Sequence, residues 1–143
     1  MKISLTGPAI RHLDRNVGYG EASYHIIDSL EKFGINVQIE AKRADIEISF
    51  ADPGNYVFLD PSSYKIGYSA WESSEMSQKF KQNISLCDEL WGTSYWISDI
   101  YRLLFPNKKI FTYQHGISNS WKPRLRKEPG KPFTFLHIGE PFS

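Results

Sequence analysis

The sequence predicts an α/β protein built on a mostly parallel sheet with helices on both of its faces. Short runs in which apolar and polar residues alternate, as in strands, are followed along the chain by segments whose apolar residues recur at helical spacing. A glycine-bearing stretch, Asn16 to Ser23, stands between the first such strand and the first such helix. Glycine or polar residues also follow several later strands, as expected where parallel strands end at a common edge.

The first half of the chain predicts three strands and one helix. Gly7-Pro8 ends the first strand, and Gly34 suits the position just after the helix because glycine tolerates a positive φ there. The predicted elements are a strand over 2–6, a helix over 21–32, and strands over 35–39 and 46–50.

The second half continues the alternation after two turns rich in proline, aspartate and serine, at 52–55 and 60–63. Its predicted elements are a strand over 65–71, a helix over 75–86, a strand over 89–94, a helix over 95–105 and a strand over 109–113. Strands separated by helices pair in parallel through right-handed crossovers, which accounts for the predicted fold class.

The pattern changes after residue 120. We expect residues 1–120 to form one domain and the basic, proline-bearing stretch 121–132 to be a linker. Residues 133–143 open with the alternating run Phe133 to Ile138 and predict the first strand of a second, truncated domain.

The composition is that of a globular protein, with 41% hydrophobic and 23% charged residues among 143. A net charge of +1 gives no argument for nucleic acid binding. The single cysteine, Cys87, excludes an internal disulfide, is expected to be structural, and favours a cytoplasmic location. No apolar run approaches the ~20 residues of a membrane span, while peripheral membrane contact stays open.

The candidate site lies where the strands end. A strand, a glycine-rich loop and a helix bring backbone N–H groups and the positive helix terminus close to an anionic ligand; the alternative is a plain strand-to-helix turn. The loop cations Arg11, His12 and Arg15 either meet that anion or are solvated. Four such ends share one edge: the Gly18 loop, Trp71-Glu72, Thr93-Ser94 and His115-Gly116.

Glu72 and Trp71 are the first candidates for chemistry. Glu72 either binds acceptor hydroxyls or acts as a base, with Trp71 as a platform for a sugar ring; alternatively, the carboxylate stabilises a helix N-terminus beside a core tryptophan. His115 either serves the site or is a hydrogen-bonded structural histidine. The spacing of His12, Asp14 and His115 does not suit a metal ion, so no metal is expected.

An ordered set of motifs covers essentially the whole chain and resembles one enzyme family. The motifs are Gly18-Tyr19-Gly20-Glu21-Ala22-Ser23, Gly67 to Glu72, Asp88 to Ser94, His115-Gly116-Ile117 with Trp121-Lys122-Pro123, and Phe133 to Glu140. They are similar to the N-terminal half of nucleotide-sugar glycosyltransferases of the GT-B architecture, in the retaining group that includes sucrose and glycogen synthases and phosphatidylinositol mannosyltransferase. That resemblance implies a Rossmann-like N-terminal domain that holds the acceptor.

The resemblance also implies a reaction and its site. A sugar would pass from a nucleotide-diphosphate donor to an acceptor hydroxyl with retention, with no tightly bound cofactor and no metal. Gly18, Tyr19 and Gly20 would form the donor-diphosphate loop and Glu72 would be catalytic. The acceptor- or sugar-facing residues would be Asn16, Trp71, Ser94 and His115. Many members carry a histidine near Trp71-Glu72, from which this sequence departs.

Most donor-binding groups of that family lie in its second domain, so we expect residues 1–143 alone to be inactive. The alternative is a non-catalytic binding or regulatory module that pairs with a separate donor-domain chain or with itself as a homo-oligomer. A nucleotide-binding protein unrelated to sugars is a third reading, which the missing third glycine of the dinucleotide fingerprint disfavours.

Overall fold

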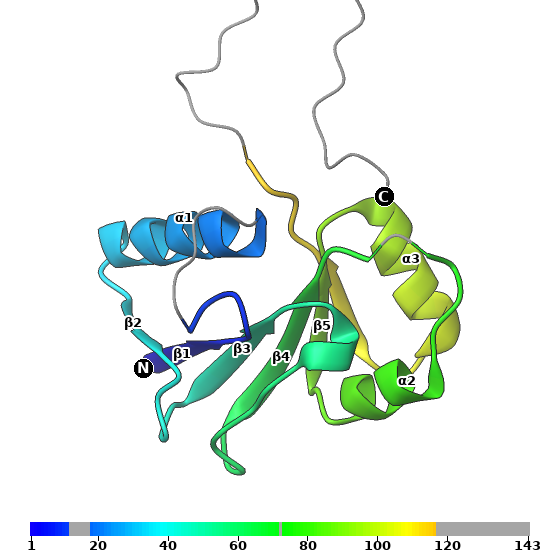
Figure 1. The fold of residues 1–143 in the computed structure, drawn as a ribbon, viewed down its shortest axis with the longest axis horizontal. Coiled ribbons are helices and arrows are strands. Elements are labelled where there is room, and N and C mark those ends of the chain that lie inside the picture. The colour runs from blue at the N-terminus through cyan, green and yellow to red at the C-terminus, as the bar shows by residue number, and fades with distance from the viewer. Residues whose placement is uncertain (12–17, 72, 117–143) are drawn as a thin grey trace, which may run out of the picture.

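The computed structural model describes residues 1–11, 18–71 and 73–116, and within them six parallel strands form a single sheet in the order β2-β1-β3-β4-β5-β6 (Figure 1). This confirms the predicted α/β, Rossmann-like fold. The strands are β1 (Lys2–Thr6), β2 (Asn36–Ile39), β3 (Ile46–Phe50), β4 (Tyr64–Ser69), β5 (Glu89–Gly92) and β6 (Lys109–Thr112). The helices are α1 (Gly18–Lys32), α2 (Gln78–Ser85) and α3 (Tyr95–Leu104), with a 3₁₀ turn, η1, at Pro53–Asn55.

Helices cover the sheet on both faces, as Figure 1 shows with α1 on one side and α2 and α3 on the other. The strand register assigns the side chains to these faces. Ile48 lies beside Leu5 and Ile66, and Phe50 lies beside Tyr68, in an apolar cluster that also contains residues of α1. A second cluster, on the other face, comprises Ile84, Cys87, Leu90, Ile97 and Tyr101.

The chain changes direction across the sheet between β1 and β3. From β1 it moves outward to β2 through α1, whereas from β3 it moves the opposite way to β4, β5 and β6. Ligands of open parallel sheets bind at such a reversal, beyond the carboxyl ends of the strands. Gly7, which follows β1, packs closely on the end of β3 there, since a β-carbon on Gly7 would lie 2.7 Å from the carbonyl oxygen of Phe50.

Glycine also sets the end of α1. Gly34 has a φ of 75°, and its N–H donates to the carbonyl of Glu31 while the N–H of Ile35 donates to that of Leu30. This pair of bonds closes the helix in the Schellman arrangement, which confirms the position predicted for Gly34.

A buried carboxylate organises the connection from β3 to β4. Glu47 is fully buried on the face opposite α1. Its carboxylate accepts hydrogen bonds from the N–H of Leu59 at 2.7 Å, the N–H of Asp60 at 3.0 Å and the hydroxyl of Ser63 at 2.6 Å. The polar side of this strand is therefore covered by loop backbone, and the side chain supplies the acceptors that the loop requires.

Two serines of the strands likewise accept hydrogen bonds from the backbone of neighbouring loops. The Ser49 hydroxyl accepts from the N–H of Val57 at 2.8 Å, and the Ser4 hydroxyl accepts from the N–H of Ala41 at 2.9 Å. Both serines are fully buried. Their small side chains leave room for loop backbone, which accounts for polar residues in a central strand.

The structure corrects several predicted boundaries. The glycine pair does not form a loop ahead of the first helix; Gly18 to Gly20 are its first turn. The strand expected to reach residue 71 ends at Ser69, and the helix expected from residue 75 begins at Gln78 because the Ser77 hydroxyl caps it, accepting from the N–H of Phe80. The predicted linker, 121–132, and the predicted start of a second domain, 133–143, lie outside the described residues.

Cys87 is 2% exposed in the second cluster, in keeping with the structural role predicted for it. Burial raises the pKa of its thiol to about 12, which keeps the sulfur protonated at neutral pH. No helix in the described part of the chain is long and apolar enough to cross a membrane.

We predict that Glu47→Gln destabilises the protein by about 2 kcal/mol or more, measured by urea unfolding followed by circular dichroism. The amide presents a donor where the carboxylate accepts, so one buried N–H of the connection loses its partner. Glu31→Gln, on the exposed surface of α1, is the control and should change the unfolding free energy little. Equal stability of the two variants would contradict the role assigned to Glu47.

Candidate functional site

Three segments that are distant in sequence meet at the carboxyl edge of the sheet. They are the first turn of α1, the residues that follow β4, and the segment Tyr113–Gly116 that follows β6 (Figure 1). Each carries residues of the predicted site.

Tyr19 joins the first turn of α1 to the end of β4. Its hydroxyl donates to the carbonyl of Ala70 at 2.9 Å and lies 3.3 Å from the N–H of the same residue, which donates to it. Ala70 directly precedes Trp71-Glu72. The glycine-bearing turn and the Trp-Glu motif are thus held next to one another by a single side chain.

A group of aromatic rings extends this junction across the strands. The ring of Tyr19 packs edge-on against Phe50, with centroids 4.8 Å apart, and Phe50 stacks on Tyr68 at 4.7 Å. His115 lies edge-on to both, at 5.5 Å from Phe50 and 5.7 Å from Tyr68. The Tyr68 hydroxyl donates to the carbonyl of Tyr113 at 2.7 Å, which fixes the segment that carries His115.

The surroundings of His115 set its charge. Partial burial against the rings of Phe50 and Tyr68 lowers its pKa below 6.5, because burial disfavours the imidazolium form. At neutral pH the ring is therefore uncharged, with one nitrogen as donor and the other as acceptor. A neutral imidazole at the rim of the site can exchange hydrogen bonds with hydroxyl groups.

Trp71 is half-buried on the α2 side of the sheet. Its ring packs edge-on against Phe80, with centroids 4.8 Å apart, and belongs to the cluster around Ile84 and Tyr101. Its buried Nε1–H has no hydrogen-bond partner among the described residues. The contacts anchor the indole in the core, and a buried N–H without a partner is an uncommon feature at the edge of a candidate site.

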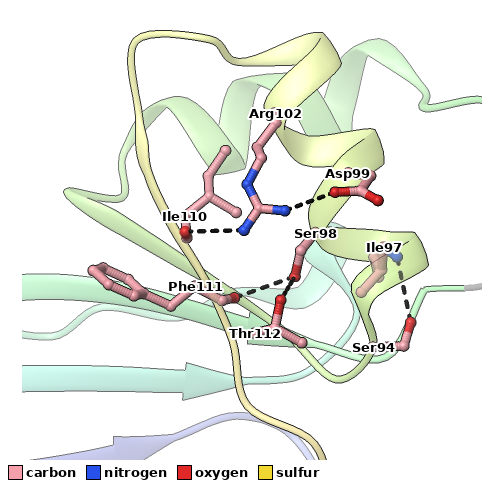
Figure 2. A network of polar contacts seen from close by, with 8 residues as sticks. All are labelled: Ser94, Ile97, Ser98, Asp99, Arg102, Ile110, Phe111 and Thr112. Atoms are coloured by element: carbon pink, nitrogen blue, oxygen red, sulfur yellow. Dashed lines mark hydrogen bonds and ion pairs between the residues drawn. The ribbon is translucent and has the colours of Figure 1, made fainter.

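Ser94 caps α3. Its hydroxyl accepts from the N–H of Ile97 at 3.3 Å, as Figure 2 shows. The same helix is fixed to β6 through Ser98, whose hydroxyl donates to the carbonyl of Phe111 and accepts from the hydroxyl of Thr112 at 2.8 Å. Ser94 thus lies at the end of β5 with its hydroxyl engaged in capping.

The structure therefore brings together part of the predicted site. Tyr19 lies against Ala70, beside Trp71, and His115 lies on Phe50, which Tyr19 also contacts. Ser94 is at the next strand end along the same edge, whereas Asn16 and Glu72 lie outside the described residues.

Sequence reasoning did not identify Phe50 and Tyr68, the two aromatic residues that support Tyr19 and His115. Phe50 is the last residue of β3 and Tyr68 the last but one of β4, and both rings lie on the α1 face. Their signal in the sequence is a large aromatic residue at the final inward position of two successive strands. That pattern alone does not separate a core residue from one that supports a site.

The charged groups of the described site are few. Arg11, expected either to meet an anion or to be solvated, forms an ion pair with Glu40 at 3.0 Å, and this contact raises the pKa of its guanidinium. His12 and Arg15 lie outside the described residues. In the described part of the chain, no three histidine, cysteine or acidic residues come together as metal ligands.

Two shallow hollows lie elsewhere on the described surface. One, of about 300 Å³, is lined by Lys2, Arg43 and Asp60 near the amino ends of the strands. The other, of about 340 Å³, lies between Tyr24 on α1 and Val37 on β2. Neither is lined by Tyr19, Trp71, Ser94 or His115, so the candidate site rests on its contacts and on its place in the fold.

No protein-family model, no curated protein and no solved structure matches this chain.

We predict that Gly92→Ala destabilises the protein by about 1–3 kcal/mol, the usual cost of overpacking. A β-carbon at this position would lie 2.5 Å from both Ile97 Cγ2 and Ser98 Oγ, where α3 crosses β5. Gly116→Ala is the control, since its β-carbon would meet no described atom within 4 Å. Urea unfolding midpoints measure the difference, and an unchanged midpoint for Gly92→Ala would contradict this close packing.

We predict that Tyr19→Phe lowers stability by about 1 kcal/mol and speeds amide exchange at Ala70, because both hydrogen bonds of the hydroxyl are lost. Hydrogen exchange measured by NMR reports the local effect and urea unfolding the global one. Tyr95→Phe, at a residue that is 67% exposed, is the matched control. Unchanged exchange at Ala70 would show that the junction does not depend on this hydroxyl.

Proposed function

We propose that this chain is the N-terminal, acceptor-side half of a glycosyltransferase that moves a sugar from a nucleotide-diphosphate donor to a hydroxyl acceptor. The observation that carries the proposal is the contact of Tyr19 with Ala70. It joins two motifs of the family resemblance, the glycine-bearing turn and the Trp71-Glu72 motif, at the edge where such folds bind ligands.

The first turn of α1 suits the approach of a diphosphate. Gly18 is exposed, and a β-carbon built on it would meet no described atom within 4 Å. Backbone N–H groups of a helix start have no partners within the helix and carry partial positive charge, which favours phosphate. Glycine keeps that backbone free of side chains that would hold the phosphate away.

The neighbouring groups suit a hydroxyl acceptor. His115 is neutral at pH 7 and lies beside the same junction. Trp71, which directly precedes Glu72 in the sequence, packs on the α2 side of the sheet. In the proposed reaction the chain positions the acceptor, and Glu72 either activates or orients its hydroxyl. Stabilisation of the leaving diphosphate falls to the glycine-bearing turn together with a second domain.

The proposal predicts that Gly18→Val weakens the binding of a nucleotide sugar at least tenfold while the protein stays folded. The valine side chain meets no described atom of the core, so we expect it to obstruct the ligand rather than the core. Isothermal titration against UDP-, GDP- and ADP-sugars and the free diphosphates measures affinity, and thermal shifts give an independent reading because ligand binding raises the melting temperature.

Ser29→Val is the control, because it places the same side chain at an exposed position of the same helix. Equal affinity of wild type and Gly18→Val would contradict a diphosphate at this turn. No response to any nucleotide would remove donor contact from the proposal and leave acceptor recognition alone. Sugar transfer by the 143-residue chain alone would contradict the proposal that a second domain is needed to bind the donor.

The second candidate is a binding or regulatory module of the same fold, which pairs with another chain or with itself. One observation favours it: Phe111 of β6 and Tyr113, which directly follows β6, are exposed on the α1 face of the sheet. This surface adjoins the candidate site, because Tyr68 contacts both Trp91 and His115.

A further inference from the structure

Strands β5 and β6 are covered very differently on their two faces. On the α3 side, Leu90 is fully buried. On the α1 side, Phe111 is 45% exposed and Tyr113 is 47% exposed. The register places Trp91 beside Phe111 on this same side. We call Trp91, Phe111 and Tyr113 the aromatic face.

The three rings form one connected surface. The centroids of Trp91 and Tyr113 are 4.4 Å apart, and those of Phe111 and Tyr113 are 6.3 Å apart. Trp91 also contacts Tyr68, at 5.7 Å, so the surface continues into the core beneath α1. Parallel sheets are normally buried on both faces, so exposed aromatic rings such as those of Phe111 and Tyr113 mark an interaction surface.

The path of the chain after β6 leads onto this side of the sheet. Tyr113 receives a hydrogen bond from Tyr68 at its carbonyl, and the ring of His115 rests on Phe50 and Tyr68. The backbone therefore turns back from β6 towards β4 and β3 over the α1 face. The described chain ends at Gly116, one residue after His115.

Two segments outside the described residues, 12–17 and 117–143, are long enough to be compared as cover for the aromatic face. Residues 12–17 are mostly polar, and only Leu13 and Val17 are large and apolar. Residues 117–143 contain the run Phe133 to Ile138, with two phenylalanines, a leucine and an isoleucine. Sixteen residues, 117–132, separate this run from Gly116 and span up to about 50 Å when extended, ten times the spacing of neighbouring strands.

We propose that the segment Phe133 to Ile138 of the same chain, expected from the sequence to open a second domain, covers the aromatic face instead. Its apolar side chains match the exposed rings in character, and its tether begins on the correct side of the sheet. Because the tether is short, the segment is held near the face at high effective concentration, which favours this contact over association with a second molecule.

A disulfide test decides the proposal. In the full chain, Phe111→Cys is combined with Phe135→Cys, and the protein is oxidised under dilute, mild conditions. Native Cys87 is 2% exposed and does not compete. We expect an intramolecular disulfide, visible as a faster-migrating monomer on non-reducing gels and confirmed by mass spectrometry of the linked peptides.

The control pairs Phe135→Cys with Phe33→Cys, because Phe33 is 84% exposed at the far end of α1. The bond at Phe111 should form at least tenfold faster than the bond at Phe33. Equal rates would show that the segment moves without docking, and a covalent dimer through Phe111 would assign the face to a second copy; either result overturns the proposal.

A second measurement does not depend on introduced cysteines. Hydroxyl-radical footprinting of the full chain should label Phe111 and Tyr113 at least threefold more strongly in Phe135→Asp than in wild type, while labelling of Phe33 stays the same. Unchanged labelling of the aromatic face in a folded variant would also overturn the proposal.

Discussion

The stacking of Phe50 on Tyr68 is the contact on which the carboxyl edge of this sheet depends. The register of β3 and β4 sets the two residues side by side, and three other parts of the chain rest on their rings or backbone. Tyr19 packs on Phe50, His115 lies on both rings, and Gly7 fits against the carbonyl of Phe50 because it has no β-carbon. The junction of distant segments is therefore a consequence of two aromatic residues at matching strand ends.

The fold could be predicted because its signals are local and repeated. The alternation in Ile46 to Phe50 correctly gave a strand, and the helical spacing over 21–32 correctly gave a helix. The same alternation does not reveal that the polar side of β3 is buried. Glu47 and Ser49 face loop backbone, and whether a polar strand residue meets water or an N–H group depends on residues far away in sequence.

The candidate site was predicted less completely, for physical reasons that differ between residues. The strand ends are set by topology, so Tyr19, Trp71 and His115 were placed at the correct edge. The hydroxyl of Ser94 is used to cap α3, which strand-and-helix patterns do not distinguish from binding a ligand. The start of α1 at Gly18 was also not evident, because glycine pairs are more typical of loops than of helical turns.

The contact between Tyr19 and Ala70 has a thermodynamic consequence. One hydroxyl both donates to and accepts from the backbone of a single residue, so restraining that backbone also restrains the first turn of α1. Suppose that one ligand binds the first turn of α1 more tightly when this contact is intact, and that a second ligand binds more tightly when Ala70 is ordered. By linkage, each ligand would then raise the affinity of the protein for the other. Two ligands at opposite ends of this side chain would thus bind with positive cooperativity, without any change in the fold of the sheet.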